Sequence, residues 1–448
     1  MRRLLVVLLP VVVAACVHGT LSWSLDGRRF AFSGLLEDDR GESDRGGLYV
    51  FDLDERSVTR PVVTDVRLST PLFLDDDRIL FAGPSSSDAP TLILSTVDRT
   101  NRRRRPLCLL RLRGPAPVED VETSAGMIVP TASEDRTRVA FNVIQPHAPP
   151  TIVVVDLLDK MLRILPVAGL FPVLTSDGRR VSFLALPGDG TSVRTIGEGA
   201  KHELKGLIDL TGETEEEFGY GETRISGLAV YDLDRNETDL AVRWKGKLDA
   251  PHWAVSRDRK VFAVAGRRGV LRFDLDAGIA TSILEDEELL RVTFDRDDRS
   301  LLAVCAGRSL KDLEGALVRV TADGEVGRVF GGPSVPRVAA FGVAPDRRTF
   351  ATVHTNPKVR DPFAVVHDLS LGTPTDVLLP DDLDSATELV MRWSDRLGGA
   401  DETELRIFDL AFKTVGRRVD VEVPADDPRR GEYAARMARA KEGRFRNR

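Results

Sequence analysis

Acidic residues gather at short turns along the sequence, and carboxylate clusters are the first chemistry to consider. Asp75-Asp76-Asp77 and Asp295-Arg296-Asp297-Asp298 could offer oxygen ligands to a calcium ion. Neither run has the Asp-x-Asp-x-Asp-Gly loop with a distant Glu that a calcium-binding loop uses. Both runs occupy a turn position that recurs along the chain. The sequence therefore predicts turn chemistry here and no metal site.

Histidines are the other candidate metal ligands. No two of them show the His-x-x-x-His or His-x-His spacing of a local site. Distant strands can still bring ligands together, so a site shared by His252 and His354 is the alternative to purely structural histidines. The histidines are His18, His147, His202, His252, His354 and His367.

Motifs for nucleophilic or cofactor-dependent catalysis are missing from the sequence. There is no Gly-x-Ser-x-Gly elbow and no glycine motif for a phosphate or a dinucleotide. Acidic pairs are abundant, but they lie at turns, so no pair stands out as a glycosidase dyad. The sequence predicts no catalytic residue, no cofactor and no enzymatic activity.

The N-terminus carries a targeting signal. Met1-Arg2-Arg3 is followed by an apolar run from Leu4 to Ala15, a pattern typical of a secretory signal and too short to cross a bilayer, which needs roughly 20 residues. Val13-Ala14-Ala15-Cys16 resembles the lipobox of bacterial lipoproteins, whose Cys is acylated and becomes the first mature residue. The resemblance implies a signal peptide over 1–15, a lipid on Cys16 and a place outside the cytoplasm, at a membrane. An ordinary signal peptide with an incidental Cys is the alternative.

Two further cysteines lie in the body of the chain. Cys305 ends an apolar, strand-like run and is expected to be a small buried hydrophobe. A disulfide between Cys108 and Cys305 is conceivable in an oxidising compartment. The repeat pattern places the two in well-separated units, which argues against it.

The elements that position these residues are repeats. The segment from Ser24 to Phe32, which contains Asp26-Gly27-Arg28-Arg29, recurs at intervals of roughly 40–60 residues, apart from one longer interval. Such a period with strand-rich units is typical of a β-propeller with one four-stranded blade per unit. The aligned turn aspartates, for which we expect a structural role, are Asp26, Asp75, Asp135, Asp177, Asp258, Asp297, Asp346 and Asp395.

Each unit also has a second half, an apolar strand that ends in Asp-Leu, as in Leu48 to Asp54 and Leu228 to Asp234. A β-branched or aromatic run favours a strand, and the acidic tetrapeptide favours a turn. Together the two halves resemble the TolB-like propeller repeat over residues 21–421. The Pro that precedes Asp in that repeat survives here at Pro345 alone. The resemblance implies an all-β propeller and protein binding in the cell envelope.

The number of blades depends on a degenerate last unit around Trp393 and Asp395. We predict an all-β propeller of eight four-stranded units over residues 16–423, with seven blades plus an irregular closing segment as the alternative. A basic tail at 424–448 contains good helix formers, so a short C-terminal helix is expected there.

One segment breaks the repeat. Residues 187–225 form an acidic insertion in the fourth unit, and Ala200 to Leu210 could form a short helix. There are two interpretations of this insertion. It is a lid or docking arm over one face of the ring, or it is a solvated loop without function.

Composition narrows the function. The chain has 448 residues, 42% of them hydrophobic and 30% charged, and a net charge of −7. These values indicate a globular protein and disfavour nucleic-acid binding, even with the run Arg102 to Arg105, which lacks interleaved aromatics for stacking.

We expect a monomeric, lipid-anchored envelope propeller that binds an envelope protein or polymer and contacts the membrane through its N-terminal lipid. A propeller hydrolase or lyase with a site on the ring axis is the alternative.

Overall fold

The computed structural model describes residues 21–378, apart from short internal segments, the longest of which are 37–44, 113–125, 211–222, 331–337 and 355–362. The signal segment, Cys16, Asp395, the eighth unit and the basic tail lie outside the described residues. Strands dominate the described chain, and its one helical turn is the 3-10 element η1 (Lys311–Leu313). No described helix is long and apolar enough to cross a membrane.

The strands follow the repeat. Most consecutive strands pair antiparallel, as hairpin connections require, and the Asp-rich turns link the first strand of a unit to its second. The first two units comprise β1 (Ser22–Trp23), β2 (Arg29–Leu36), β3 (Arg45–Asp52), β4 (Ser57–Thr64), β5 (Leu72–Phe73), β6 (Arg78–Pro84), β7 (Thr91–Asp98) and β8 (Arg104–Arg111).

Units three and four share a strand. The N-terminal part of β12 (Met161–Leu174) pairs with β11, and its C-terminal part pairs with β13, so the two units form one continuous sheet. The strands of this sheet are β9 (Gly126–Ala132), β10 (Arg138–Gln145), β11 (Ala148–Asp156), β12, β13 (Arg180–Ala185), β16 (Thr223–Asp232) and β17 (Glu237–Leu248), with β14 (Ala200–Glu203) at its side.

Three four-stranded sheets complete the described chain. They contain β18 (His252–Val255), β19 (Val261–Gly266), β20 (Gly269–Asp274) and β21 (Ile279–Glu285); β22 (Leu289–Phe294), β23 (Leu301–Cys305), β24 (Leu317–Val320) and β25 (Val326–Phe330); and β26 (Val338–Val343), β27 (Thr349–His354), β28 (Phe363–Asp368) and β29 (Thr373–Leu378).

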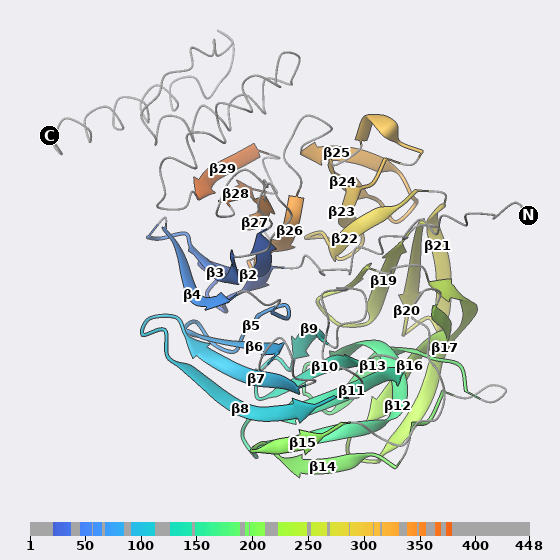
Figure 1. Ribbon diagram of the computed structural model, residues 1–448. Helices are drawn as coiled ribbons and strands as arrows, with labels where there is room; N and C mark the ends of the chain where they lie inside the picture. Colours follow the sequence, from blue (N-terminus) through green and yellow to red (C-terminus); the bar gives the residue numbers. More distant parts are fainter. Residues whose placement is uncertain are drawn as a thin grey trace, which may run out of the picture.

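The sheets are arranged around an axis, so the all-β, propeller-like prediction is confirmed. Figure 1 shows the strands following one another round the axis, from blue through green and yellow to orange. The first strands of neighbouring units contact one another, for instance β1 with β5 and β22 with β26, and these strands line the axis.

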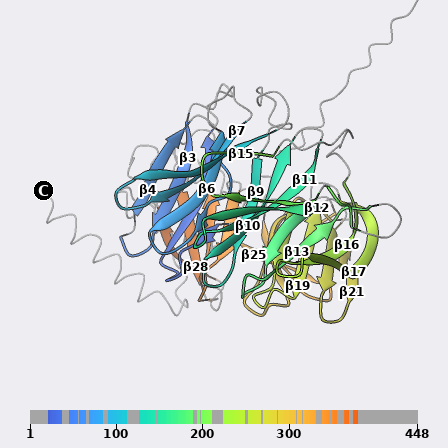
Figure 2. The same cartoon turned by 90° about the horizontal axis from the view of Figure 1, so that it is seen from below.

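The first described unit lies directly against the last. The N–H of Leu21 donates a hydrogen bond to the carbonyl of Phe341 at 3.2 Å, and β1 contacts β26. The blue and orange strands are neighbours in both views (Figures 1 and 2).

The hydrophobic core lies between the sheets. Phe73, Ile79 and Phe81 of unit two, for example, pack against Leu48 and Val50 of unit one. Buried apolar clusters of this kind join units one and two, two and three, three and four, four and five, five and six, and seven and one. Because each sheet buries both faces, its strands are apolar on both sides, as in the fully buried run of β23.

The prediction of a short helix over Ala200 to Leu210 is wrong. This segment forms two strands, β14, which pairs antiparallel with β12, and β15 (Leu207–Asp209), which pairs parallel with β8. The insertion therefore runs back along the outer side of units three and two (Figure 1). Its local composition suits a helix, but the unpaired outer edges of β12 and β8 supply backbone partners that a helix would leave unused.

Candidate functional site: the ring of turns at the axis

The turn after each first strand has a recurring hydrogen-bond pattern. In unit one the hydroxyl of Ser24 donates to Asp26 at 2.6 Å, and the N–H of Arg28 donates to the same carboxylate at 2.9 Å. The Ser24 hydroxyl oxygen in turn accepts the N–H of Arg29 at 3.0 Å, which closes the turn. The same contacts recur around Asp135, Asp177 and Asp258.

The remaining turn aspartates differ in detail. Asp75 and Asp297 accept N–H groups two and three residues further on, and Asp346 accepts the N–H of Thr349. The carboxylates at all seven described turn positions are therefore engaged by their own turns.

These bonds change the acidity of the turn carboxylates. The hydroxyl of Ser133, followed by the N–H of Thr137, lowers the pKa of Asp135. Thr175 and the N–H of Arg179 lower the pKa of Asp177 in the same way. These aspartates are therefore held in the ionised form.

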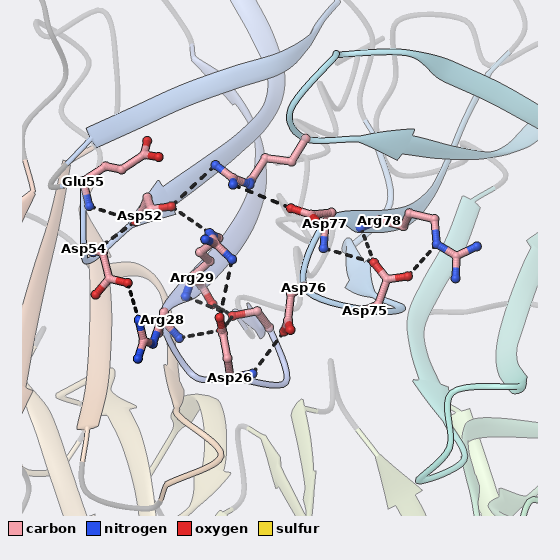
Figure 3. Close-up of polar contacts among 12 residues, drawn as sticks. Asp26, Arg28, Arg29, Asp52, Asp54, Glu55, Asp75, Asp76, Asp77 and Arg78 are labelled. Atoms are coloured by element: carbon pink, nitrogen blue, oxygen red, sulfur yellow. Dashed lines mark hydrogen bonds and ion pairs between the residues drawn. The ribbon is translucent and has the colours of Figure 1, made fainter.

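An arginine links the two halves of a unit. Arg29 begins β2 and lies opposite Asp52 at the end of β3, with Nε 2.7 Å from the carboxylate (Figure 3). Asp52 also accepts the N–H groups of Asp54 and Glu55, both at 3.0 Å. Arg138–Asp156 at 2.8 Å and Arg180–Asp232 at 3.4 Å repeat this pairing in units three and four.

Neighbouring turns contact one another. The N–H of Asp26 donates to Asp76 of the next unit at 3.1 Å (Figure 3), and the N–H of Arg257 donates to Asp298 at 3.0 Å. Between units three and four, the N–H of Glu134 donates to the carbonyl of Ser176 at 2.9 Å. These contacts join the turns of units one and two, three and four, and five and six.

The residue after each aligned aspartate has positive φ in several units. Gly27 and Gly178, with φ of 70° and 68°, accept this conformation at no steric cost, whereas Arg136 and Arg259 adopt it at 57° and 60°. A side chain is therefore present in units three and five where units one and four have none.

Both arginine side chains turn toward a neighbouring first strand. Arg136 Nη1 donates to the carbonyl of Phe73, the last residue of β5, at 3.2 Å. Arg259 Nη1 donates to the carbonyl of Leu174, the last residue of β12. Both guanidinium groups thus lie at the strand ends that line the axis.

The electrostatic surroundings of these two groups are unusual for arginine. Burial lowers the pKa of Arg136, and the positive charge of Arg259 lowers it further. Burial also lowers the pKa of Arg259, which Glu134 opposes. Sequence reasoning missed this pair, although Arg in place of the turn Gly was a visible signal.

The other candidate residues lie apart from this ring. His252 is buried in β18, and the side chain of His354 lies outside the described side chains. Across the described residues, no group of three or more His, Cys, Asp and Glu is placed to hold a metal ion.

Cys108 and Cys305 are both buried, and no disulfide joins them. Burial raises the pKa of Cys108 to about 12. The Cys305 thiol lies 3.5 Å from Oε1 of Glu287, a fully buried carboxylate that also accepts the N–H groups of Ser309 and Leu310.

Comparison with known proteins finds similarity to solved structures alone. No protein-family model matches it, and no curated protein matches it. Among solved structures, TolB from Acinetobacter baumannii is 11% identical over 78% of this chain and 80% of its own, with a TM-score of 0.40. The β-propeller domain of Cps50 (Swd1) from Myceliophteria thermophila is 12% identical over 75% and 92%, with a TM-score of 0.44.

An oligogalacturonate lyase in complex with manganese is also similar, at 13% identity over 81% of this chain and 89% of its own, with a TM-score of 0.45. The propeller-like architecture of this chain follows from its strand pairing and from the contacts between its sheets.

Proposed function

We propose that this protein is a lipid-anchored binding module of the bacterial cell envelope, which holds a protein or envelope polymer on its propeller without chemical conversion. The Val-Ala-Ala-Cys16 signal supports the anchor and the location. The observation that supports the binding role is the set of side chains at the turns and strand ends near the axis of the ring. Its turn aspartates are occupied by their own turns, and its two inward guanidinium groups are hydrogen-bond donors that do not exchange protons near neutral pH.

We infer that the ring has seven blades. An eighth blade in sequence order would separate unit seven from unit one, yet Leu21 and Phe341 are hydrogen-bonded and Trp23 packs in one cluster with Ala351 and Val353. This favours the alternative of seven blades with an irregular closing segment. A chain that ends after residue 378 should then unfold cooperatively near the melting temperature of the intact chain. Loss of the cooperative unfolding transition in the shortened chain would support eight blades.

The insertion remains the proposed contact for a macromolecular partner. Its strands β14 and β15 cover the outer edges of units three and two, so removal of the whole insertion would damage the scaffold. The informative change therefore keeps β14 and β15 and alters Glu213, Glu215, Glu216 and Glu217 to Gln. Cross-linking in envelope extracts, followed by mass spectrometry, should show the loss of specific partners from this variant. An unchanged partner set would remove the insertion from the proposal.

The anchor is tested separately. Cys16→Ser should move the protein from the membrane fraction to the soluble extracytoplasmic fraction, because the lipid has no other attachment point in the proposal. Membrane retention of this variant after a carbonate wash would overturn the lipid anchor.

A further inference from the structure

The start of β1 is held in place at the axis by its neighbours. The N–H of Leu21 donates to the carbonyl of Phe341 in β26, and the N–H of Phe73 in β5 donates to the hydroxyl of Ser22 at 2.8 Å. Leu21 is 7% exposed, and a Cβ atom added to Gly342 would lie 3.1 Å from the Leu21 Cβ. Units seven and two therefore fix the point at which the chain enters the ring.

The strand order defines two faces of the ring. Each first strand ends at an aligned aspartate turn; we call the face that carries these turns the turn face, and the opposite face, where the first strands begin, the mouth face. The second and fourth strands of a unit run from the turn face to the mouth face, so β23 ends at the mouth face and η1 follows there. Glu287, just before β22, accepts the N–H of Leu310 at 2.8 Å, which holds the segment that leads into η1 beside the start of a first strand.

Leu21 lies inside the ring, at some depth from the mouth face. The equivalent turn hydrogen bonds place Leu21 level with Phe341 of unit seven and Pro130 of unit three. β26 begins three positions before Phe341, at Val338, and β9 begins four positions before Pro130, at Gly126. At about 3.3 Å per residue, these strand starts lie roughly 10–13 Å closer to the mouth face than Leu21 does. A chain that enters along the direction of β1 has to cross this depth.

The proposed lipid site is close to Leu21 in the sequence. Cys16 precedes Leu21 by five positions, and five residues span at most about 17 Å when fully extended. The depth of the ring takes up most of this length, so about 4–7 Å remain between the rim of the mouth face and the residue that bears the lipid. This remainder is no more than the thickness of a headgroup layer, about 5–8 Å. The ring therefore cannot stand clear of the surface that holds the lipid.

We propose that the mouth face lies against the phospholipid surface that holds the Cys16 lipid, with the turn face directed away from it. The bilayer then covers one end of the axis, and a soluble partner reaches the ring through the turn face or through the outer edges of the sheets. The insertion remains accessible in this orientation, because its strands β14 and β15 lie on outer edges.

This inference rests on the proposed lipid anchor and adds the orientation of the anchored ring. The two proposals fail separately. Fractionation of Cys16→Ser tests the anchor, whereas the orientation depends on which face is protected in a protein that stays on the membrane.

The experiment uses the full lipidated chain in vesicles of phosphatidylethanolamine and phosphatidylglycerol. Single cysteines replace exposed residues on each face, and the rate of their reaction with a bulky polyethylene glycol maleimide is measured. The native Cys108 and Cys305 are buried. Each rate is compared with that of the same variant in the soluble Cys16→Ser protein. The probes are Lys311→Cys in η1 and Glu285→Cys at the end of β21 for the mouth face, and Arg179→Cys and Arg257→Cys for the turn face.

We expect the mouth-face probes to react about tenfold or more slowly in vesicles than in the soluble protein, and the turn-face probes to change by less than about twofold. A flexible tether of about 20 Gly and Ser residues inserted before Leu21, which spans about 25 Å, should restore the mouth-face rates to within about twofold of the soluble values. Equal protection of both faces, or protection of the turn face alone, would overturn the orientation. Protection that survives the long tether would also overturn it, because tether length would then not hold this face to the membrane.

Discussion

Arg29 and Asp52 form an ion pair that joins the two halves of the repeat, with 2.7 Å between Arg29 Nε and Asp52 Oδ2 and an Asp52 side chain that is 3% exposed. Arg99 of the next unit approaches the same carboxylate at 3.5 Å. One aspartate thus fixes a turn, a strand pair and a junction between two blades.

Replacement of Asp52 by Ala should destabilise the protein by about 1.5–3 kcal/mol, because it removes the carboxylate that the largely buried Arg29 and Arg99 share, while Asp26 and Asp77 remain near them at 3.4 and 3.6 Å. Urea unfolding measures this change. Asp54→Ala serves as the control, since its pair with Arg28 at 2.8 Å is more than half exposed and should contribute no more than about 1 kcal/mol. Equal effects of the two substitutions would contradict the role given to Asp52.

Stability should fall on acidification. The folded-state pKa values of Asp135, Asp177 and Asp232 lie below the unfolded value of about 3.9, so their contribution is complete above that pH and disappears as the pH drops through the folded values. Melting temperatures measured from pH 6 to pH 2 should decline steeply below about pH 4. The double variant Asp135→Asn and Asp177→Asn should show a lower melting temperature at pH 6 and a shallower decline. A slope identical to that of the parent would count against these two carboxylates.

The strand β15 should be part of the stable scaffold. Ile208 is 3% exposed and packs with Leu110 and Leu112. Ile208→Ala should cost about 2–5 kcal/mol through the cavity that it leaves. The neighbouring Leu207 is 47% exposed, and Leu207→Ala should change stability by less than about 0.5 kcal/mol.

Amide hydrogen exchange in the parent protein tests the pairing of β15 without a substitution. The N–H of Leu109 donates to the carbonyl of Gly206 at 2.8 Å, and the N–H of Leu210 donates to Arg111 at 2.9 Å. Both amides should be strongly protected in the parent and lose protection in Ile208→Ala before the inner strands do. Fast exchange of both amides in the parent would contradict the pairing of β15 with β8.

The two cysteines of the body should be unreactive in the native state. The raised pKa of Cys108, about 12, leaves almost no thiolate at neutral pH, and both side chains are buried. In the Cys16→Ser protein, Ellman's reagent should label neither thiol natively and both in guanidinium chloride. Labelling of a single thiol, or of none, after unfolding would indicate a modification or a disulfide.

The sequence was sufficient for the parts of the fold that local chemistry decides. Ser24-x-Asp26-Gly27 and the Asp-Leu ends of the third strands are turn signals in themselves, and their period predicted the propeller-like arrangement. The structure of the insertion could not be predicted in this way. The partner of β15 is β8, about a hundred residues earlier, and no local sequence pattern indicates pairing with the edge of a distant strand.

The axis pair shows the same limit. Arg136 and Arg259 each look like an ordinary turn residue, and their hydrogen bonds to Phe73 and Leu174 depend on how neighbouring units are stacked. The number of blades also depends on long-range contacts. The sequence repeat gives the number of units, whereas the contact between Leu21 and Phe341 shows which two units pack against each other.

The packing of the first described unit against the last described unit has a consequence for biosynthesis. Trp23, Phe30 and Phe51 emerge among the earliest parts of the chain, yet the residues that cover them, such as Val353 and Val366, are made more than three hundred positions later. During synthesis, a large aromatic face therefore stays exposed to solvent and prone to aggregation until the seventh unit has been made. Protection by a chaperone would matter most in the interval before these two units pack together.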